Sequence, residues 1–320
     1  MIDVLSYLVF FSVIAGIYAV ATLGLNLQWG LAGIMNVGVV GFFGVGAYAS
    51  AFLTGPDWPD GFGGLGLHPV LGWLGAMVVA GGAALVVGIP TIRLKHDFLA
   101  VGTFGIAICI QLVAMNWRPV TRGFDGLHSL PKPFLSIAAT PLQANLAYLG
   151  VVVAIVAALA FAMERMARSP WGRMLRAIRE DEQAAAALGK NAFAVRLESF
   201  VLGSMLMGLA GALYANFLGF VSPQDLLPIF TFQVFVMLIV GGSGDTFGAI
   251  LGAVLIWGLW TVTETVLSAL LPAELRQQVA ALRVVLVGAI LVAMLLFRPQ
   301  GLLPERRNVS PEARLDLTRR

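Results

Sequence analysis

Residues 164–191 read ERMARSPWGRMLRAIREDEQAAAALGKN, and this charged segment, called here the polar island, lies between two long apolar stretches. Of the 320 residues, 59% are hydrophobic and 12% are charged, whereas a soluble domain carries about 25% charged residues. The composition therefore predicts a polytopic membrane protein. Such a protein places a large charged, helix-forming segment only where water or a partner protein meets it, and the excess of arginine assigns the island to the cytoplasmic side.

Apolar stretches of the length that a spanning helix needs, about 20 residues, recur along the chain. Clear candidates are residues 69–89, 98–117, 143–163, 197–218, 247–268 and 281–297. Shorter or broken candidates are residues 4–20, 22–35, 37–54 and 229–242. The sequence thus predicts an all-α polytopic membrane protein with about ten transmembrane helices, or about eight to ten if the glycine-rich part of residues 1–54 is re-entrant.

The basic residues orient these spans. Arg93 and Lys95 mark one cytoplasmic loop, the island marks a second, and the arginines of residues 298–320 mark a cytoplasmic tail. Three crossings within residues 1–54 would then put the N-terminus in the cytoplasm as well. We expect a transmembrane domain at 1–297, containing a cytoplasmic loop at 164–196, followed by a tail at 298–320.

Residues 25–48, LNLQWGLAGIMNVGVVGFFGVGAY, place amide side chains among closely spaced glycines. Amides in hydrocarbon need internal partners, and a broken helix is tolerated only where it is buried in protein or lines a wet cavity. One interpretation is a translocation path, and the other, compatible with it, is close helix packing through small residues. Candidate path-lining residues are Asn26, Asn36, Phe42, Phe43 and Thr103.

Several kinds of chemistry lack their residues. Ion-driven carriers hold ionisable side chains near the membrane midplane, but here the acidic residues lie in loops or near span ends, which disfavours such a carrier. His68, His96 and His128 are far apart in the sequence, so no metal site is expected. No GxxxxGK[ST] loop is present, so any ATP must be bound by another chain. Basic residues do not alternate with aromatic ones, which argues against a nucleic-acid partner.

The second half of the island carries helix signals. Acidic residues 180–182 precede the run from Ala184 to Leu188, where they favour the helix dipole, and Gly189 stands where a helix commonly ends. A short helix here, around residues 179–189, can fit a groove of a partner and transmit its motion. The alternative is a solvated charged loop.

The island segment SPWGRMLRAIREDEQAAAALG, residues 169–189, resembles the cytoplasmic loop of branched-chain amino acid ABC importer permeases, specifically of the LivM type within the LivH/LivM family. Other segments are similar to the same family in the same order. They are residues 26–48, TRGFDGL at 121–127, GLAGALY at 208–214, VSPQ at 221–224, VGGSG at 240–244 and LFRPQGL at 296–302.

The resemblance implies the permease subunit of an ATP-driven importer in the bacterial inner (plasma) membrane. Its implied partners are a second, LivH-type permease, two ABC ATPase subunits that hold ATP and Mg, and a periplasmic substrate-binding protein. This chain would carry no cofactor and no catalytic residue. The EAA-x3-G coupling motif resembles the family's in altered form, with Gln183 at the Glu position. The implied ATPase-coupling residues are Arg176, Arg179, Glu180, Asp181, Glu182, Gln183, Ala185 and Gly189.

Charged residues on the outward loops are candidates for docking the binding protein: Arg122, Asp125 and Asp225, with simple solubility groups as the alternative. Branched-chain or related amino acids are the expected substrates, although LivM-type relatives are also associated with urea, amides and carboxylates. The competing class is a stand-alone secondary carrier or channel. A membrane enzyme is disfavoured because no nucleophile, base or metal constellation can be assembled.

Overall fold

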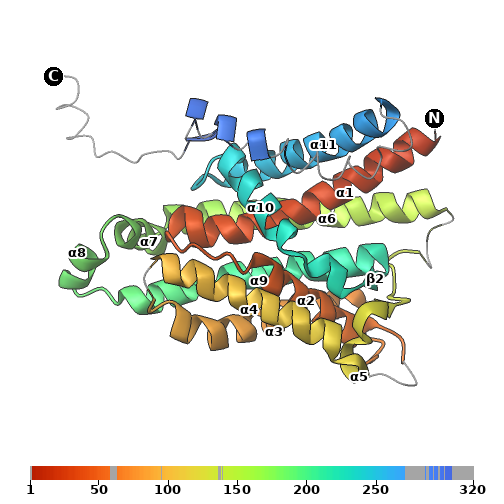
Figure 1. Cartoon of the computed structure of the whole chain (residues 1–320), viewed down its shortest axis with the longest axis horizontal. Helices are drawn as coiled ribbons and strands as arrows, with labels where there is room; N and C mark the ends of the chain where they lie inside the picture. The colour runs from red at the N-terminus through yellow and green to blue at the C-terminus, as the bar shows by residue number, and fades with distance from the viewer. Residues whose placement is uncertain are drawn as a thin grey trace.

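The computed structural model describes residues 2–57, 63–94, 96–135, 138 and 140–270, and shorter pieces between 285 and 304. Long helices run side by side, and two short helices project beyond one end of the bundle (Figure 1). The long ones are α1 (Ile2–Leu25), α2 (Val39–Thr54), α3 (Pro69–Thr91), α4 (His96–Asn116), α6 (Pro141–Arg168), α9 (Ala192–Leu218), α10 (Pro228–Gly241) and α11 (Thr246–Leu270). The short ones are the π-helix η1 (Asn26–Leu31), α5 (Arg118–Thr121), η2 (Gly123–Asp125), α7 (Pro170–Glu180), α8 (Glu182–Ala187) and η3 (Pro223–Leu226).

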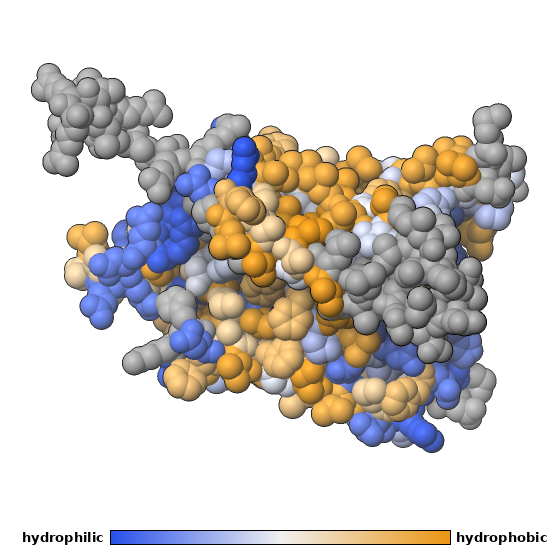
Figure 2. All heavy atoms as spheres, turned by 45° about the horizontal axis from the view of Figure 1, so that its top comes forward, coloured by the Kyte–Doolittle hydropathy of each residue, from blue (hydrophilic) through white to orange (hydrophobic). Residues whose placement is uncertain are grey.

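Six helices within the described residues are long and apolar enough to cross a membrane. They are α1 with η1, α3, α4, α6, α9 and α11, while α2 and α10 are shorter apolar helices. Figure 2 shows hydrophobic atoms across the middle of the visible face and hydrophilic atoms toward its ends. The prediction of an all-α multi-pass membrane protein is confirmed, whereas the count of about ten spans is not. Much of the predicted span at 281–297, and residues 305–320 of the predicted tail, lie outside the described residues.

The N-terminal region differs from the prediction. Residues 4–20 and 22–35 were expected to form two helices, but α1 continues into η1 as one apolar span, Val4–Leu31, and the N-terminus lies at the end opposite α7 and α8 (Figure 1). The prediction of three crossings within residues 1–54, with the N-terminus on the island's side, is therefore wrong. The segment stays continuous because its polar groups find partners: Thr22 donates to the Tyr18 carbonyl at 2.8 Å, and Asn26 and Gln28 bond the α10–α11 turn and α9. Gly24 serves close packing instead, since a Cβ there would lie 2.6 Å from the Gly203 carbonyl oxygen.

Close packing around α9 organises the bundle. Helices α1, α2 and α3 all pack on α9, and glycines face each other where they cross. At Gly46 of α2 and Gly208 of α9 the backbones themselves are in contact, and a Cβ at Gly208 would also lie 3.1 Å from the Ala76 carbonyl oxygen of α3. Glycine-rich residues 25–48 thus serve packing through small residues, the mode by which membrane helices approach closely.

A second close crossing joins α10 to α11. Gly241 of α10 faces Gly248 and Gly252 of α11, so a side chain at Gly241 would meet the Gly248 backbone. The chain after residue 298 returns to this point: the Leu302 N–H donates to the Val240 carbonyl and the Leu303 N–H to the Gly241 carbonyl, each at 2.9 Å. The start of the predicted tail is therefore attached to the end of α10.

Asn216 of α9 joins three helices and a loop. Its side-chain oxygen accepts from Ser50 of α2 and Trp73 of α3, both at 3.0 Å, and its amide donates to Thr54 at 3.2 Å and to the Pro131 carbonyl at 3.3 Å. The residue is fully buried. It was not singled out in the sequence, because nothing in the chain's local pattern shows that these partners meet.

Replacing Asn216 by leucine is expected to lower the free energy of unfolding by about 2–4 kcal/mol. Several buried donors and acceptors lose their partner, at about 1–3 kcal/mol each. The expected total is below the full sum because side-chain hydrogen bonds between membrane helices contribute less than this. Unfolding in denaturing detergent measures the change. In a Trp73→Phe background the cost should shrink, since one of the orphaned donors is then absent. An Asn216→Leu protein as stable as wild type would contradict the assigned role.

Candidate functional site: the island hairpin and the π-helix beneath it

The island folds as two helices, α7 and α8, instead of the one short helix expected around residues 179–189. Ser169 begins α7 by accepting from the Gly172 N–H at 3.3 Å, with Pro170 in the first turn. Asp181, in an extended conformation, ends α7 and begins α8, because its carboxylate accepts from the Gln183 and Ala184 N–H groups at 2.9 Å. This is the capping role that acidic residues favour. We call the pair, residues 170–187, the island hairpin.

The hairpin ends as predicted. Helix α8 stops at Ala187, and Gly189 follows with φ of 76°, the left-handed conformation that glycine supplies at helix ends. One face of α7 is buried through Gly172, Leu175 and Ile178. The hairpin is hence a packed helical element, and the alternative of a solvated loop is excluded.

The predicted coupling residues divide into two groups. Four of them are exposed on the projecting hairpin: Glu180, Asp181, Glu182 and Gln183, together with Gly189. Ala185 is buried, and Arg176 and Arg179 are half-buried and point back to the membrane domain. The Arg176 guanidinium donates to the Ala167 carbonyl of α6 at 2.5 Å. Glu182 pairs with the buried Arg196 of α9 at 2.9 Å, which attaches α8 to the next helix.

Arg179 makes the most distant of these attachments. Its guanidinium donates to the carbonyl of Gly30 in η1, 149 positions away in the sequence. Its aliphatic stem packs on Gly33, where φ is 68° and a Cβ would lie 2.8 Å from the Arg179 Cγ. The island hairpin therefore contacts the end of the N-terminal span directly.

The amides of η1 are all satisfied inside the protein. Asn26 accepts from the Gly244 N–H at 2.8 Å and donates to the Asp245 carbonyl at 3.2 Å, which joins η1 to the turn between α10 and α11. Gln28 donates to the Phe200 carbonyl of α9 at 2.6 Å and accepts from Asn36 at 2.8 Å. Internal pairing of this kind lets a π-helix and an irregular segment exist at membrane depth.

The five candidate path-lining residues are all buried. Asn36 accepts from the Gly38 N–H, and Thr103 of α4 accepts from the Val37 N–H at 3.1 Å, so both hold the irregular segment between η1 and α2. Phe42 packs edge-on against Phe200 of α9, and Phe43 against Phe230 of α10 and Tyr214 of α9. Within this single chain they are packing and network residues, and a role in a path stays a prediction.

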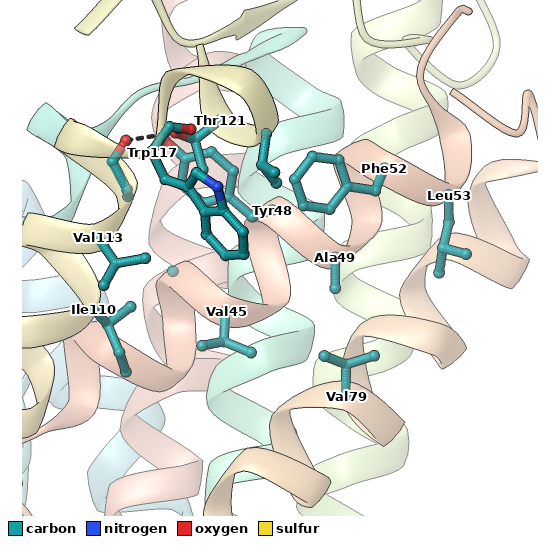
Figure 3. A pocket seen from close by; sticks show the side chains of 13 residues that line it. Val45, Tyr48, Ala49, Phe52, Leu53, Val79, Ile110, Val113, Trp117 and Thr121 are labelled. Carbon is teal, nitrogen blue, oxygen red and sulfur yellow. Dashed lines mark hydrogen bonds between the residues drawn. The ribbon is translucent and has the colours of Figure 1, made fainter. Parts of the chain in front are cut away.

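A cavity of about 370 Å³ lies elsewhere, between α2, α3, α4 and α5. Figure 3 shows apolar side chains lining it, with Val45 and Phe52 from α2, Val79 from α3 and Ile110 from α4. None of the five path candidates lines this cavity. Its apolar walls fit hydrocarbon, and they offer little to a charged or zwitterionic solute.

The three docking candidates lie at the end of the molecule opposite the hairpin, where α5 and β2 are found (Figure 1). Strand β1 (Leu127–His128) pairs antiparallel with β2 (Phe220–Val221), which brings their two loops together. Asp125 is exposed, and Arg122 is half-buried with φ of 59°. Asp225 accepts from the Ser222 N–H at 2.9 Å and from the Tyr214 hydroxyl at 3.1 Å, so it holds η3 in place.

The sequence analysis missed the residues that complete the network. Gly30 was not singled out, yet a Cβ there would lie 2.6 Å from the Gly244 nitrogen, and Asn26, Gly244 and Arg179 all converge on it. A weak signal existed, since the glycine-rich motif at 240–244 and the amides at 26–36 are both unusual in apolar spans. Their contact is tertiary and could not be derived from either segment alone.

The fold and the site together define a class: a multi-pass helical membrane protein with a helical hairpin at one end, attached to a glycine- and amide-rich interior. A family model described as branched-chain amino acid transport system / permease component matches residues 7–295. The chain belongs to this family of transport permease components, which confirms the resemblance carried by residues 169–189 and the assignment as a permease subunit of an ABC importer.

Individual relatives agree with the family. The chain is 30% identical to the high-affinity branched-chain amino acid transport system permease protein LivM of Escherichia coli K12, over 91% of this chain and 68% of that protein. It is 26% identical to the probable LivM of Methanocaldococcus jannaschii, over 92% of this chain and 93% of that one. It is also 26% identical to LivH of Salmonella typhimurium, over 89% and 91%. A match to the autoinducer 2 import system permease protein LsrC of Escherichia coli shows that similar permeases serve other systems.

Proposed function

We propose that this chain forms, with a second permease of the LivH type, the path by which an ATP-driven importer moves branched-chain or related amino acids across the bacterial inner membrane. The island hairpin carries this proposal. It projects from the bundle, exposes acidic and small residues and is attached by arginines to the membrane domain. Such a surface suits docking by an ABC ATPase. The complex would contain two ATPase subunits, and these would bind ATP and Mg. The names of the LivM and LivH relatives support the substrate class.

The proposed orientation follows from the hairpin. With residues 170–187 in the cytoplasm, as their arginines favour, the N-terminus and the β1–β2 loops face the periplasm. There Arg122, Asp125 and Asp225 would meet a substrate-binding protein. Asp225 is already engaged by Ser222 and Tyr214, so we assign it to shaping the docking loop, and Arg122 and Asp125 to the contact itself.

Co-purification tests this function. Leu188, 80% exposed directly after the last residue of the hairpin, is an apolar side chain that a partner would cover. We expect affinity-tagged wild type to bring down two ATPases and a second permease, identified by mass spectrometry. Leu188→Asp should reduce the bound ATPases at least about tenfold, because a charge would be buried without a partner, while the second permease is retained.

Leu65→Asp is the matched control, since Leu65 is 66% exposed in the loop between α2 and α3, where its N–H bonds the Phe52 carbonyl at 3.3 Å. It should leave the ATPases bound. A wild-type chain that purifies alone under gentle conditions and transports solute in vesicles without ATP would refute the importer and restore the stand-alone carrier.

A further inference from the structure

Motion at the hairpin needs a physical route into the membrane domain, and the hairpin is attached there at several points. Three of these lead to the helices next to it in the chain: Arg176 donates to the Ala167 carbonyl of α6, Trp171 donates to the Glu198 carboxylate of α9 at 2.9 Å, and Glu182 pairs with Arg196 of α9. The contact from Arg179 to η1 differs from these three, because it joins the hairpin to a segment far away in the sequence.

The contact at η1 fits the chemistry of a helix end. The Gly33 N–H bonds the Trp29 carbonyl and the Ile34 N–H bonds the Gln28 carbonyl, while the Gly30 carbonyl accepts from the Arg179 guanidinium. Carbonyls at a helix C-terminus carry partial negative charge and favour a cation. Because the Arg179 stem also packs against Gly33, the side chain holds η1 both by hydrogen bonding and by contact.

From η1 the connections continue to two further elements. Asn26 holds the Gly244 and Asp245 backbone, and Gln28 holds the Phe200 carbonyl and the Ser204 hydroxyl of α9. The π-helical turn is a form that occurs as single-turn bulges, frequently at functional sites. A displacement of Gly30 would thus act on the α10–α11 turn and on the middle of α9 together.

We propose that Arg179 is the positioning residue that transmits movement of the island hairpin to η1, and through η1 to the α10–α11 turn and α9. This rests on the proposed docking of ATPases on the hairpin. In this proposal Arg179 contacts the π-helix of its own chain, and the exposed residues around Leu188 contact the partner.

The test compares Arg179→Ala with Arg173→Ala in the complete complex. Arg173 lies on the same helix, is exposed, and donates to the Arg168 carbonyl at 3.1 Å within the island. Hydrogen exchange of residues 26–38 and 241–245 is measured without nucleotide and after trapping with ATP and vanadate. We expect trapping to change exchange in both segments in wild type and in Arg173→Ala, and to leave it unchanged in Arg179→Ala, whose ATPases stay bound.

A second readout is the uptake of labelled leucine per ATP hydrolysed in proteoliposomes. It should fall about tenfold in Arg179→Ala, within the range of typical coupling between sites. Arg179→Lys keeps the charge but loses the planar guanidinium, so its uptake per ATP should lie between that of wild type and that of Arg179→Ala. If Arg179→Ala does not assemble, Arg179→Lys is used for the test in its place.

Three outcomes of these experiments would contradict the proposed role of Arg179. Wild-type exchange and coupling in an Arg179→Ala complex that retains its ATPases would overturn this inference alone. Loss of the ATPases from Arg179→Ala but not from Arg173→Ala would overturn it too, because the side chain would then be a partner contact. Absence of ATPases from the wild-type complex would overturn the docking proposal and this inference together.

Discussion

Changing Gly46 to leucine is expected to prevent the membrane domain from assembling. Gly46 of α2 touches the backbone of Gly208 in α9, so a new Cβ cannot be accommodated by turning a side chain. Overpacking a core costs about 1–3 kcal/mol when side chains can adjust, and occasionally more. Here whole helices must separate, and we expect a loss at or above about 3 kcal/mol, against a total stability of about 5–15 kcal/mol for a typical protein. Size-exclusion chromatography of a fluorescent fusion would show aggregate in place of a monodisperse peak.

Gly82→Leu provides the matched control for this change. Gly82 lies on α3, is exposed, and has no heavy atom within 4 Å of the position that a Cβ would take. The same substitution there adds an apolar side chain to a surface that faces hydrocarbon, so yield and melting temperature should equal those of wild type. If Gly46→Leu behaved like Gly82→Leu, the direct contact between α2 and α9 would not be the arrangement of the folded protein.

The long helices could be predicted from the sequence because length and hydropathy are local properties. The predicted stretches at 69–89, 98–117 and 143–163 lie within a few residues of α3, α4 and α6. The error at residues 4–35, by contrast, has a tertiary cause. Gly24 and the amides at 26 and 28 suggest a helix break, but their partners in α9 and in the α10–α11 turn stabilise a continuous α-to-π transition. Such partners are invisible until the tertiary structure is known.

The sequence predicted which residues form the charged helical segment better than it predicted which way their side chains point. One short helix was expected around residues 179–189, and the structure has α8 at Glu182–Ala187 with α7 before it, while Gly189 follows the end of α8 as expected. What the sequence could not supply was which charges point outward and which point inward. Helical spacing alone places Arg176 and Arg179 on neighbouring faces of α7, but only the packed structure shows that Arg179 reaches Gly30 of a helix that lies far away in the sequence.

Replacing Asn26 by leucine is expected to uncouple η1 from the α10–α11 turn. The substitution removes the acceptor of the Gly244 N–H and the donor to the Asp245 carbonyl. Leaving two buried backbone groups without these partners costs about 1–3 kcal/mol each, so the free energy of unfolding should fall by about 2–6 kcal/mol. If Asn26 instead served only to line a wet path, water would replace it and stability would change little, although transport would suffer.

Asn116→Leu separates these two roles, because it is the same substitution in another membrane helix. Asn116 of α4 is exposed, and its side chain donates to the Leu112 carbonyl of its own helix at 2.8 Å. Unfolding in denaturing detergent, measured beside leucine uptake, should show Asn26→Leu strongly destabilised and Asn116→Leu close to wild type. If the two variants were equally stable and uptake were lost only in Asn26→Leu, Asn26 would belong to the translocation path instead of the structural network. In that case water must satisfy the Gly244 N–H and the Asp245 carbonyl in place of the Asn26 side chain.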